Sequence, residues 1–261
     1  MRCLVVSDLH YALPQFDWLT SVAPRYDLIV FAGDALDVGS MVDFSAQTLV
    51  VQKYLQRVAD KTQLIFCSGN HDLDFRSESG EKVARWIERL HKLGIACDGD
   101  ALVIGDTLYS VFPWWDGPSV KERLIAQLSA DATRRATRRW IWAHHAPPRD
   151  SQTSWSGKQS FGDTELTDWI AQYSPDVVIS GHVHQSPFVE NGSWADRVGS
   201  TWIFNSGRQY GSPPAYIVID TAIGEALWIS AMGAQSVRLD APLPRPIPSL
   251  HALPNWFEPA P

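Results

Sequence analysis

The sequence predicts an α/β fold in which helices cover a sheet built partly of parallel strands. Short, nearly all-apolar runs alternate along the chain with longer amphipathic stretches, as in repeated strand–helix–strand units. Two further segments are typical of antiparallel hairpins, so antiparallel strands should join the parallel ones, in one mixed sheet or in two stacked sheets. With 261 residues, of which 45% are hydrophobic, the chain can bury a substantial core.

Five segments are predicted as buried strands. Each is almost entirely apolar, as expected for a strand that is covered on both faces. They are residues 2–6, 27–32, 63–67, 140–143 and 176–180. The two hairpins are predicted at residues 101–112, around Gly105-Asp106, and at residues 215–231, around Gly224.

Three helices are predicted from apolar residues at helical spacing. The first covers residues 46–60 and the second residues 83–93. The third carries its apolar stripe from Leu166 to Tyr173, with Asp163 or Thr164 placed to cap its first turn.

The end of the chain has a different composition. Seven of the twenty residues from Pro242 to Pro261 are proline, which excludes regular secondary structure and predicts an extended arm. We therefore expect a core domain at residues 1–240 and a Pro-rich arm at residues 241–261.

Composition excludes several classes of protein. There are 22 Lys+Arg against 29 Asp+Glu, a net charge of −7, which disfavours general binding to nucleic acid. The sequence contains no run of 18 apolar residues, and its N-terminal apolar run is too short for a secretory signal. Three widely spaced cysteines cannot form a disulfide framework and indicate a reducing compartment. A soluble, cytoplasmic protein is expected.

Five polar motifs follow predicted strands, at the point where each strand ends. They are Asp8-Leu9-His10, Gly33-Asp34-Ala35-Leu36-Asp37, Gly69-Asn70-His71-Asp72, His144-His145 and Gly181-His182-Val183-His184. Six of the eight histidines of the chain lie in these motifs. Because ligands collect at the carboxyl ends of strands in open α/β sheets, we expect the motifs to converge on one site.

The residue types in these motifs predict a metal site. Carboxylate and imidazole together suit divalent transition metals such as Mn, Fe, Co, Ni or Zn. Two aspartates, one asparagine and three or four histidines exceed the needs of one ion, so two metal ions are predicted. Ions ~3.5–4 Å apart can hold both the attacking and the leaving oxygen of an in-line displacement.

In their order and gaps, the motifs between residues 6 and 184 resemble those of the calcineurin-like metallophosphoesterase superfamily. The resemblance implies a four-layer α/β/β/α sandwich with two mixed β-sheets. It also implies hydrolysis of a phosphomonoester or phosphodiester by a hydroxide that bridges two metal ions. The implied ligands are Asp8, His10 and His184 for one ion, Asn70, His144 and His182 for the other, and Asp34 between them. His144 is preferred over His145 because the family ligand directly follows its strand.

The resemblance also implies the residues that contact the substrate. His71 matches a family histidine that contacts the phosphate and the leaving group, and Asp37 or Asp72 would orient it. His71 and Asp37 are thus the predicted catalytic residues, and the predicted substrate contacts are Asn70, His71, His145 and Arg208. Trp114-Trp115 are expected on a loop, where they either wall a substrate pocket or pack against the arm.

Two other functions are compatible with this fold. A non-catalytic scaffold, such as the retromer subunit of the same superfamily, would be free to lose ligands, and the sequence lacks none of them. A metal-dependent nuclease would need a long basic groove, which the charge of −7 disfavours. The expected partner is therefore a small phosphate ester, with neither membrane nor nucleic acid.

Overall fold

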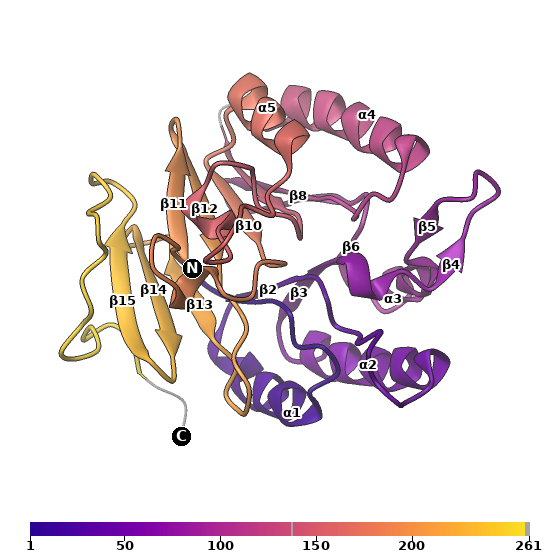
Figure 1. Ribbon diagram of the computed structural model, residues 1–261, viewed down its shortest axis with the longest axis horizontal. Helices are drawn as coiled ribbons and strands as arrows, with labels where there is room; N and C mark the ends of the chain where they lie inside the picture. Colours follow the sequence, from indigo (N-terminus) through magenta and orange to yellow (C-terminus); the bar gives the residue numbers. More distant parts are fainter. Residues whose placement is uncertain (137, 259–261) are drawn as a thin grey trace.

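The computed structural model describes residues 1–136 and 138–258, in which two β-sheets pack face to face between two layers of helices (Figure 1). This arrangement confirms the predicted four-layer sandwich. The last three residues of the predicted arm, 259–261, lie outside the described residues. In the described part of the chain, no helix has the length and apolar character needed to cross a membrane.

The first sheet has seven strands in the order β15-β14-β13-β1-β2-β3-β6. Its parallel half contains β1 (Arg2–Val6), β2 (Leu28–Ala32), β3 (Gln63–Cys67) and β6 (Ala96–Cys97). Its antiparallel half contains β13 (Tyr216–Asp220), β14 (Glu225–Ser230) and β15 (Gly233–Arg238). The predicted hairpin around Gly224 is therefore confirmed as β13–β14.

The second sheet has six strands in the order β11-β12-β10-β9-β8-β7. Its strands are β7 (Ala101–Ile104), β8 (Thr107–Val111), β9 (Arg139–Ala143), β10 (Val177–Ser180), β11 (Ala195–Val198) and β12 (Thr201–Asn205). The four inner strands are parallel, and β7 and β11 pair with them in antiparallel fashion at the two edges. Both sheets are thus mixed, and all five predicted buried strands are present.

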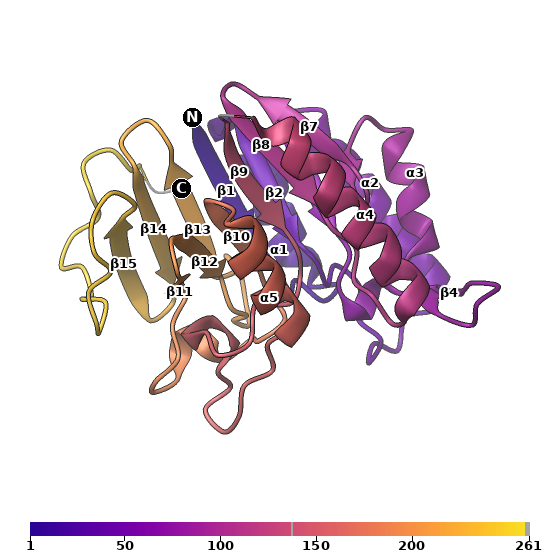
Figure 2. The ribbon, with the colours of Figure 1, turned by 90° about the horizontal axis from the view of Figure 1, so that it is seen from above.

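Helices cover the outer faces of the two sheets. Against the first sheet lie α1 (Leu13–Val22), α2 (Phe44–Ala59) and α3 (Glu88–His91), and against the second lie α4 (Pro118–Arg135) and α5 (Thr164–Tyr173). Figure 2 shows α4 and α5 crossing the outer face of the second sheet. The Asp163 side chain caps α5 by accepting a hydrogen bond from the Leu166 amide at 2.8 Å, as predicted.

The predicted helix over residues 83–93 is wrong in its extent. Val83 belongs to β5 (Lys82–Val83), which pairs with β4 (Phe75–Arg76) in a small hairpin. The segment continues as a 3₁₀ turn before the four residues of α3. Trp86 explains the difference, because its amide donates to the Asp74 carboxylate and its indole donates to a backbone carbonyl. These tertiary contacts override the helical pattern.

Apolar side chains form three separate cores. One lies between the first sheet and its helices, one between the two sheets, and one between the second sheet and its helices. Successive residues of a strand point to opposite faces, so Leu4 faces the helices while Val5 faces the other sheet. Burial on both faces explains why the strands read as continuous apolar runs.

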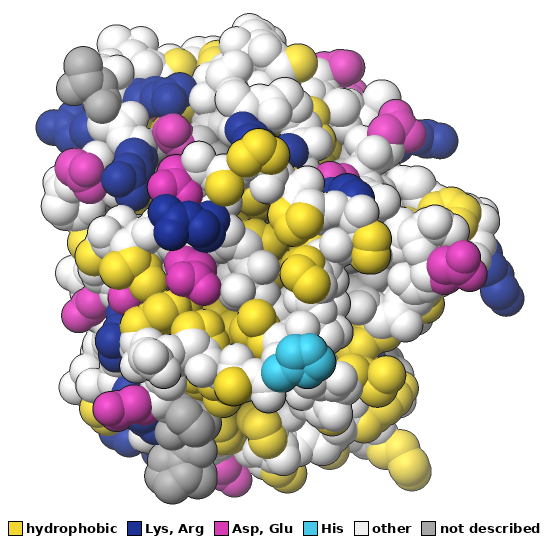
Figure 3. All heavy atoms as spheres, turned by 90° about the vertical axis from the view of Figure 1, so that its left-hand side faces the viewer, with side chains coloured by type: hydrophobic (Ala, Val, Ile, Leu, Met, Phe, Trp, Pro, Cys, Tyr) yellow, Lys and Arg dark blue, Asp and Glu magenta, His cyan; other side chains and the backbone are white. Residues whose placement is uncertain are grey.

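The Pro-rich segment packs along the outside of the domain. The Leu250 amide donates to the carbonyl of Ala234 in β15, and the Trp256 indole donates to the Glu225 carboxylate in β14. Phe257 is only 8% exposed and belongs to the core beneath the first sheet. Figure 3 views this side of the molecule, where hydrophobic side chains lie among charged ones.

Phe257→Ala should therefore lower the free energy of unfolding by about 3 kcal/mol, because it removes a buried ring from that core. Denaturant unfolding would measure the change, with Leu253→Ala as the control, since Leu253 is 37% exposed. Both variants should keep their metal content, because every candidate ligand lies between residues 8 and 184. Equal stability of the two variants would show that the segment is only loosely attached.

Candidate metal centre

The five polar motifs meet at one edge of the double sheet. β1, β2 and β3 are parallel to one another, as are β9 and β10, so their carboxyl ends carry the motifs to common edges. Contacts between the sheets show that these two edges face each other: the His182 amide donates to both carboxylate oxygens of Asp8 at 3.1 Å. The predicted convergence is thus present in the structure.

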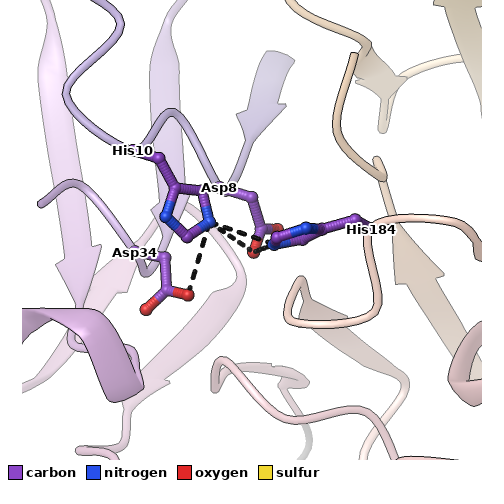
Figure 4. A group of neighbouring side chains, drawn as sticks. All are labelled: Asp8, His10, Asp34 and His184. Carbon is purple, nitrogen blue, oxygen red and sulfur yellow. Dashed lines mark hydrogen bonds and ion pairs between the residues drawn. The ribbon is translucent and has the colours of Figure 1, made fainter. Parts of the chain in front are cut away.

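Four side chains form the first part of the site (Figure 4). They are Asp8, His10, Asp34 and His184, and one possible ligand atom from each lies within 4.8 Å of the other three. Nε2 of His184 lies 3.2 Å from Oδ1 of Asp8, and Nε2 of His10 lies 3.6 Å from Oδ2 of Asp34. The two Nε2 atoms are 3.0 Å apart, so both imidazoles point to the same place. This cluster could hold a metal ion.

A second group continues from Asp34. Nε2 of His145 lies 3.2 Å from Oδ2 of Asp34 and 3.8 Å from Oδ1 of Asp8. Nδ1 of His182 lies 2.9 Å from Oδ1 of Asn70. Asp34 and Asp8 thus each lie within 4 Å of histidines of both groups, and Asp34 is the nearer of the two to His145.

The two consecutive histidines take opposite directions. His145 faces the aspartates, whereas the ring of His144 stacks on Trp115 with centroids 4.7 Å apart and an angle of 7° between the planes. Strand alternation explains this difference. Ala143 faces the core between the sheets, so His144 faces the helices and His145 again faces the space between the sheets. The structure therefore places His145, and not the preferred His144, beside Asp34.

The backbone around the site is tightly constrained. Asp8 and Asp34 have positive φ angles of 57°, and His182 has one of 68°, values that non-glycine residues seldom adopt. A Cβ atom on Gly69 would lie 2.2 Å from the Asp34 carboxylate, and one on Gly181 would lie 2.5 Å from the Asp8 carboxylate. Glycine is thus required at both positions for close approach of the chain to the aspartates.

Asp72 connects the turn after β2 with the turn after β3. Its buried carboxylate accepts hydrogen bonds from the amides of Asp34, Ala35, Leu36 and Gly69, at 2.8–3.0 Å. Burial and the nearby Asp34 raise the pKa of Asp72 to about 8. Asp72 therefore holds the backbone of the Asp34 turn, which the sequence did not predict, and the hydrogen bonds of its carboxylate run to these backbone amides instead of His71.

His71 lies at the open side of the site, with its side chain 25% exposed. Its Nδ1 accepts the amide hydrogen of Val38 at 3.4 Å and lies 4.0 Å from the Asp37 carboxylate. The His71 amide donates to Asp34 at 2.8 Å, while the ring stands edge-on to that of His10. Burial lowers the pKa of His71, although Asp34 opposes it. Burial therefore favours the neutral form of the ring, with the Val38 amide directed at Nδ1.

The aspartates give the site a negative charge. Burial alone would raise the pKa of Asp8, but hydrogen bonds to His10 and His184 hold it well below its usual range. The pKa of Asp34 is also lowered, because His145 outweighs the effect of burial. Burial alone would lower the pKa of His145, but the two carboxylates have the larger effect and raise it to about 9. A bound cation would take the place of the His145 proton.

Two other sequence candidates lie around this centre. The amide of Arg208 donates to the His184 carbonyl at 3.1 Å, but its guanidinium lies over the ring of Tyr210.

The ring of Trp114 lies 5.0 Å from that of His182, whereas Trp115 packs against Trp169. Both tryptophans lie on a loop, as predicted. The ring of Trp114 contacts the site, and the ring of Trp115 contacts the core.

Comparison with known proteins identifies relatives of this fold. The family model for calcineurin-like phosphoesterase matches residues 1–186. The structure is similar to TT1561 of Thermus thermophilus, with a TM-score of 0.56 and 15% identity over 91% of this chain and 98% of that chain. It is also similar to the purple acid phosphatase PPD1 from yellow lupin (Lupinus luteus) seeds, with a TM-score of 0.54 and 12% identity over 92% of this chain and 51% of that chain. At these identities the likeness concerns the fold alone. No curated protein sequence matches the chain.

Proposed function

The chain belongs to the calcineurin-like phosphoesterase family, and on that premise we propose that it hydrolyses a small phosphate ester at a centre of two divalent metal ions. The observation that carries this proposal is the position of Asp34. Its oxygen Oδ2 lies 3.6 Å from Nε2 of His10 and 3.2 Å from Nε2 of His145, with all three side chains buried. A shared carboxylate between two sets of ligands is the arrangement that a two-ion site requires.

The donor set fits the proposed ions. Imidazole nitrogens and carboxylate or amide oxygens suit divalent transition metals. Among the described residues, Nε2 of both His144 and His145 is buried without a hydrogen-bond partner, and that of His145 faces the carboxylates, 3.2 Å from Asp34. The proposed ligands are Asp8, His10 and His184 for one ion, Asn70, His145 and His182 for the other, and Asp34 for both.

The bound ions would supply an activated water and stabilise negative charge on the phosphoryl group. The surrounding side chains would orient the ester and control its protons. Nδ1 of His71 accepts a hydrogen bond from the chain, so the neutral ring can donate a hydrogen bond from Nε2 to a phosphate oxygen. A ring protonated on both nitrogens would give its Nε2 proton to the departing oxygen and return to the neutral form. Asp37, 4.0 Å from Nδ1, would favour that protonated form.

Metal content tests the two-ion proposal. Protein purified with Mn or Zn in the buffer should contain about two ions per chain. Asp34→Asn should lower the occupancy of both positions because its carboxylate is shared, whereas Asp8→Asn should chiefly lower one. Elemental analysis after gel filtration would measure both. Equal, small losses in the two variants would mean that Asp34 does not bridge.

Activity tests the hydrolytic part of the proposal. The protein should be stripped of metal and assayed on aryl phosphomonoesters and phosphodiesters before and after addition of Mn, Ni, Co or Zn. Turnover that depends on added metal is the expected result. Stoichiometric metal without turnover on any ester would indicate a non-catalytic scaffold instead.

A further inference from the structure

A cavity of about 340 Å³ lies beside the candidate metal centre. Its lining includes Ser68, which follows β3, and Asp98, which follows β6. Pro113 and Trp114, which lie beyond the end of β8, line it from the other sheet. β6 is the neighbour of β3 and β8 is the neighbour of β9, so the cavity lies one strand further along the same edge as the metal centre. Its volume is in the range of small-ligand sites.

Trp114 joins the cavity to the metal centre. Its partly buried indole lines the cavity, and the same ring lies 5.0 Å from the ring of His182 and 5.7 Å from that of His145. The backbone amide of Trp114 donates to Oγ of Ser68 at 3.0 Å, two residues before Asn70. A group in contact with this indole would therefore be next to the residues proposed to bind metal.

Apart from Arg123, which also lines the cavity, the polar side chains of the lining make hydrogen bonds within the described part of the protein. The Asp98 carboxylate accepts hydrogen bonds from the amide and the hydroxyl of Ser68, at 2.8 and 2.6 Å. The Gln127 amide donates to the carbonyls of Asp100 and Val111. Much of the remaining wall is apolar and is formed by Val83, Ala84, Pro113, Val120 and Leu124. The cavity thus offers a ligand the surface of an indole and aliphatic side chains, with the exposed Arg123 beside them.

We propose that this cavity binds the organic group of the phosphate ester, and that this group is a flat aromatic ring. A substrate whose phosphate lies at the metal centre would extend along the carboxyl edge, past Trp114, to the next strand. An aromatic ring gains more from an indole and a narrow apolar wall than a flexible alkyl chain does, because it loses less conformational freedom on binding. This inference rests on the proposed phosphoesterase function.

Benzyl and butyl phosphate, together with their methyl diesters, test the proposal. The two alcohols have similar acidity, so their esters differ mainly in the shape of the organic group. The wild-type protein should favour the benzyl ester by about tenfold or more in kcat/KM, mostly through KM. Trp114→Ala should reduce this preference to near unity. Val83→Trp, which fills the cavity from the opposite wall, should do the same, and Trp155→Ala serves as the control that keeps the preference.

Equal kcat/KM values for the benzyl and butyl esters in the wild-type protein would overturn the proposal. An equal loss for both esters in Trp114→Ala would also overturn it, because Trp114 would then only support the metal ligands. Titration calorimetry with benzylphosphonate and butylphosphonate, which cannot be hydrolysed, measures the cavity separately from turnover. Tighter binding of benzylphosphonate without hydrolysis of any ester would support the cavity and refute the phosphoesterase function.

Discussion

His145→Ala should remove one of the two proposed metal positions and reduce kcat/KM by more than about 100-fold, the upper end of what is lost when only an outer partner of a ligand is removed. The reason is geometric. His145 points its Nε2 atom at both aspartates from a fully buried position, whereas its Nδ1 is held by the carbonyl of Ala32 at 2.6 Å. Elemental analysis and a chelator competition would measure the lost ion.

His144→Ala is the matched control, because it removes the same side chain one residue earlier. It should lower metal affinity no more than about tenfold, since the His144 ring stacks on Trp115, away from the aspartates. His144→Phe should restore any stability lost from that stack. If His144→Ala instead loses an ion and His145→Ala keeps both, the assignment of the ligand must be reversed.

His71→Ala should keep both metal ions and yet lose turnover. Its side chain lies beside the Asp34 turn and is partly exposed, and a group that positions or donates a proton contributes ~10²–10⁴-fold. The loss should be largest for esters of alkyl alcohols, whose oxygen needs a proton to leave. It should be smallest for p-nitrophenyl esters, whose leaving group is stable as an anion.

Steady-state kinetics on an alkyl and a p-nitrophenyl ester would measure this difference, with metal content determined for the same samples. Asp37→Asn provides the comparison, because it alters the partner of Nδ1 and keeps the ring. It should lower turnover less than His71→Ala does. Wild-type turnover of an alkyl ester by His71→Ala would exclude His71 from proton donation.

The strands and the order of the motifs could be predicted because both depend on local patterns. A strand buried on both faces must be apolar throughout, so each of the five segments was visible in the sequence. The direction of His145 was also accessible, because it follows from alternation along β9. The family position favours His144 as the ligand, whereas strand geometry favours His145, and the metal content of the two variants decides between them.

Other features depend on contacts that the sequence does not contain. Helix α1 has no side-chain cap and follows the first motif directly, so Pro14 in its first turn was a weak signal of its start. The shortened α3 results from hydrogen bonds of Trp86 with residues of the preceding turn. The cavity beside Trp114 forms only when β6 and β8, from different sheets, lie at the same edge.

The four hydrogen bonds of Asp72 have a consequence for how metal enters and leaves. They join the Asp34 turn to Gly69, next to Asn70, from inside the protein, so the two turns keep their relative position without help from an ion. Ligands that are already in place need little rearrangement when an ion binds. Binding therefore loses no free energy to the ordering of a loop. Ions can then exchange with the surrounding medium while the polypeptide stays as it is, so the metal that is most available can determine which one the protein carries.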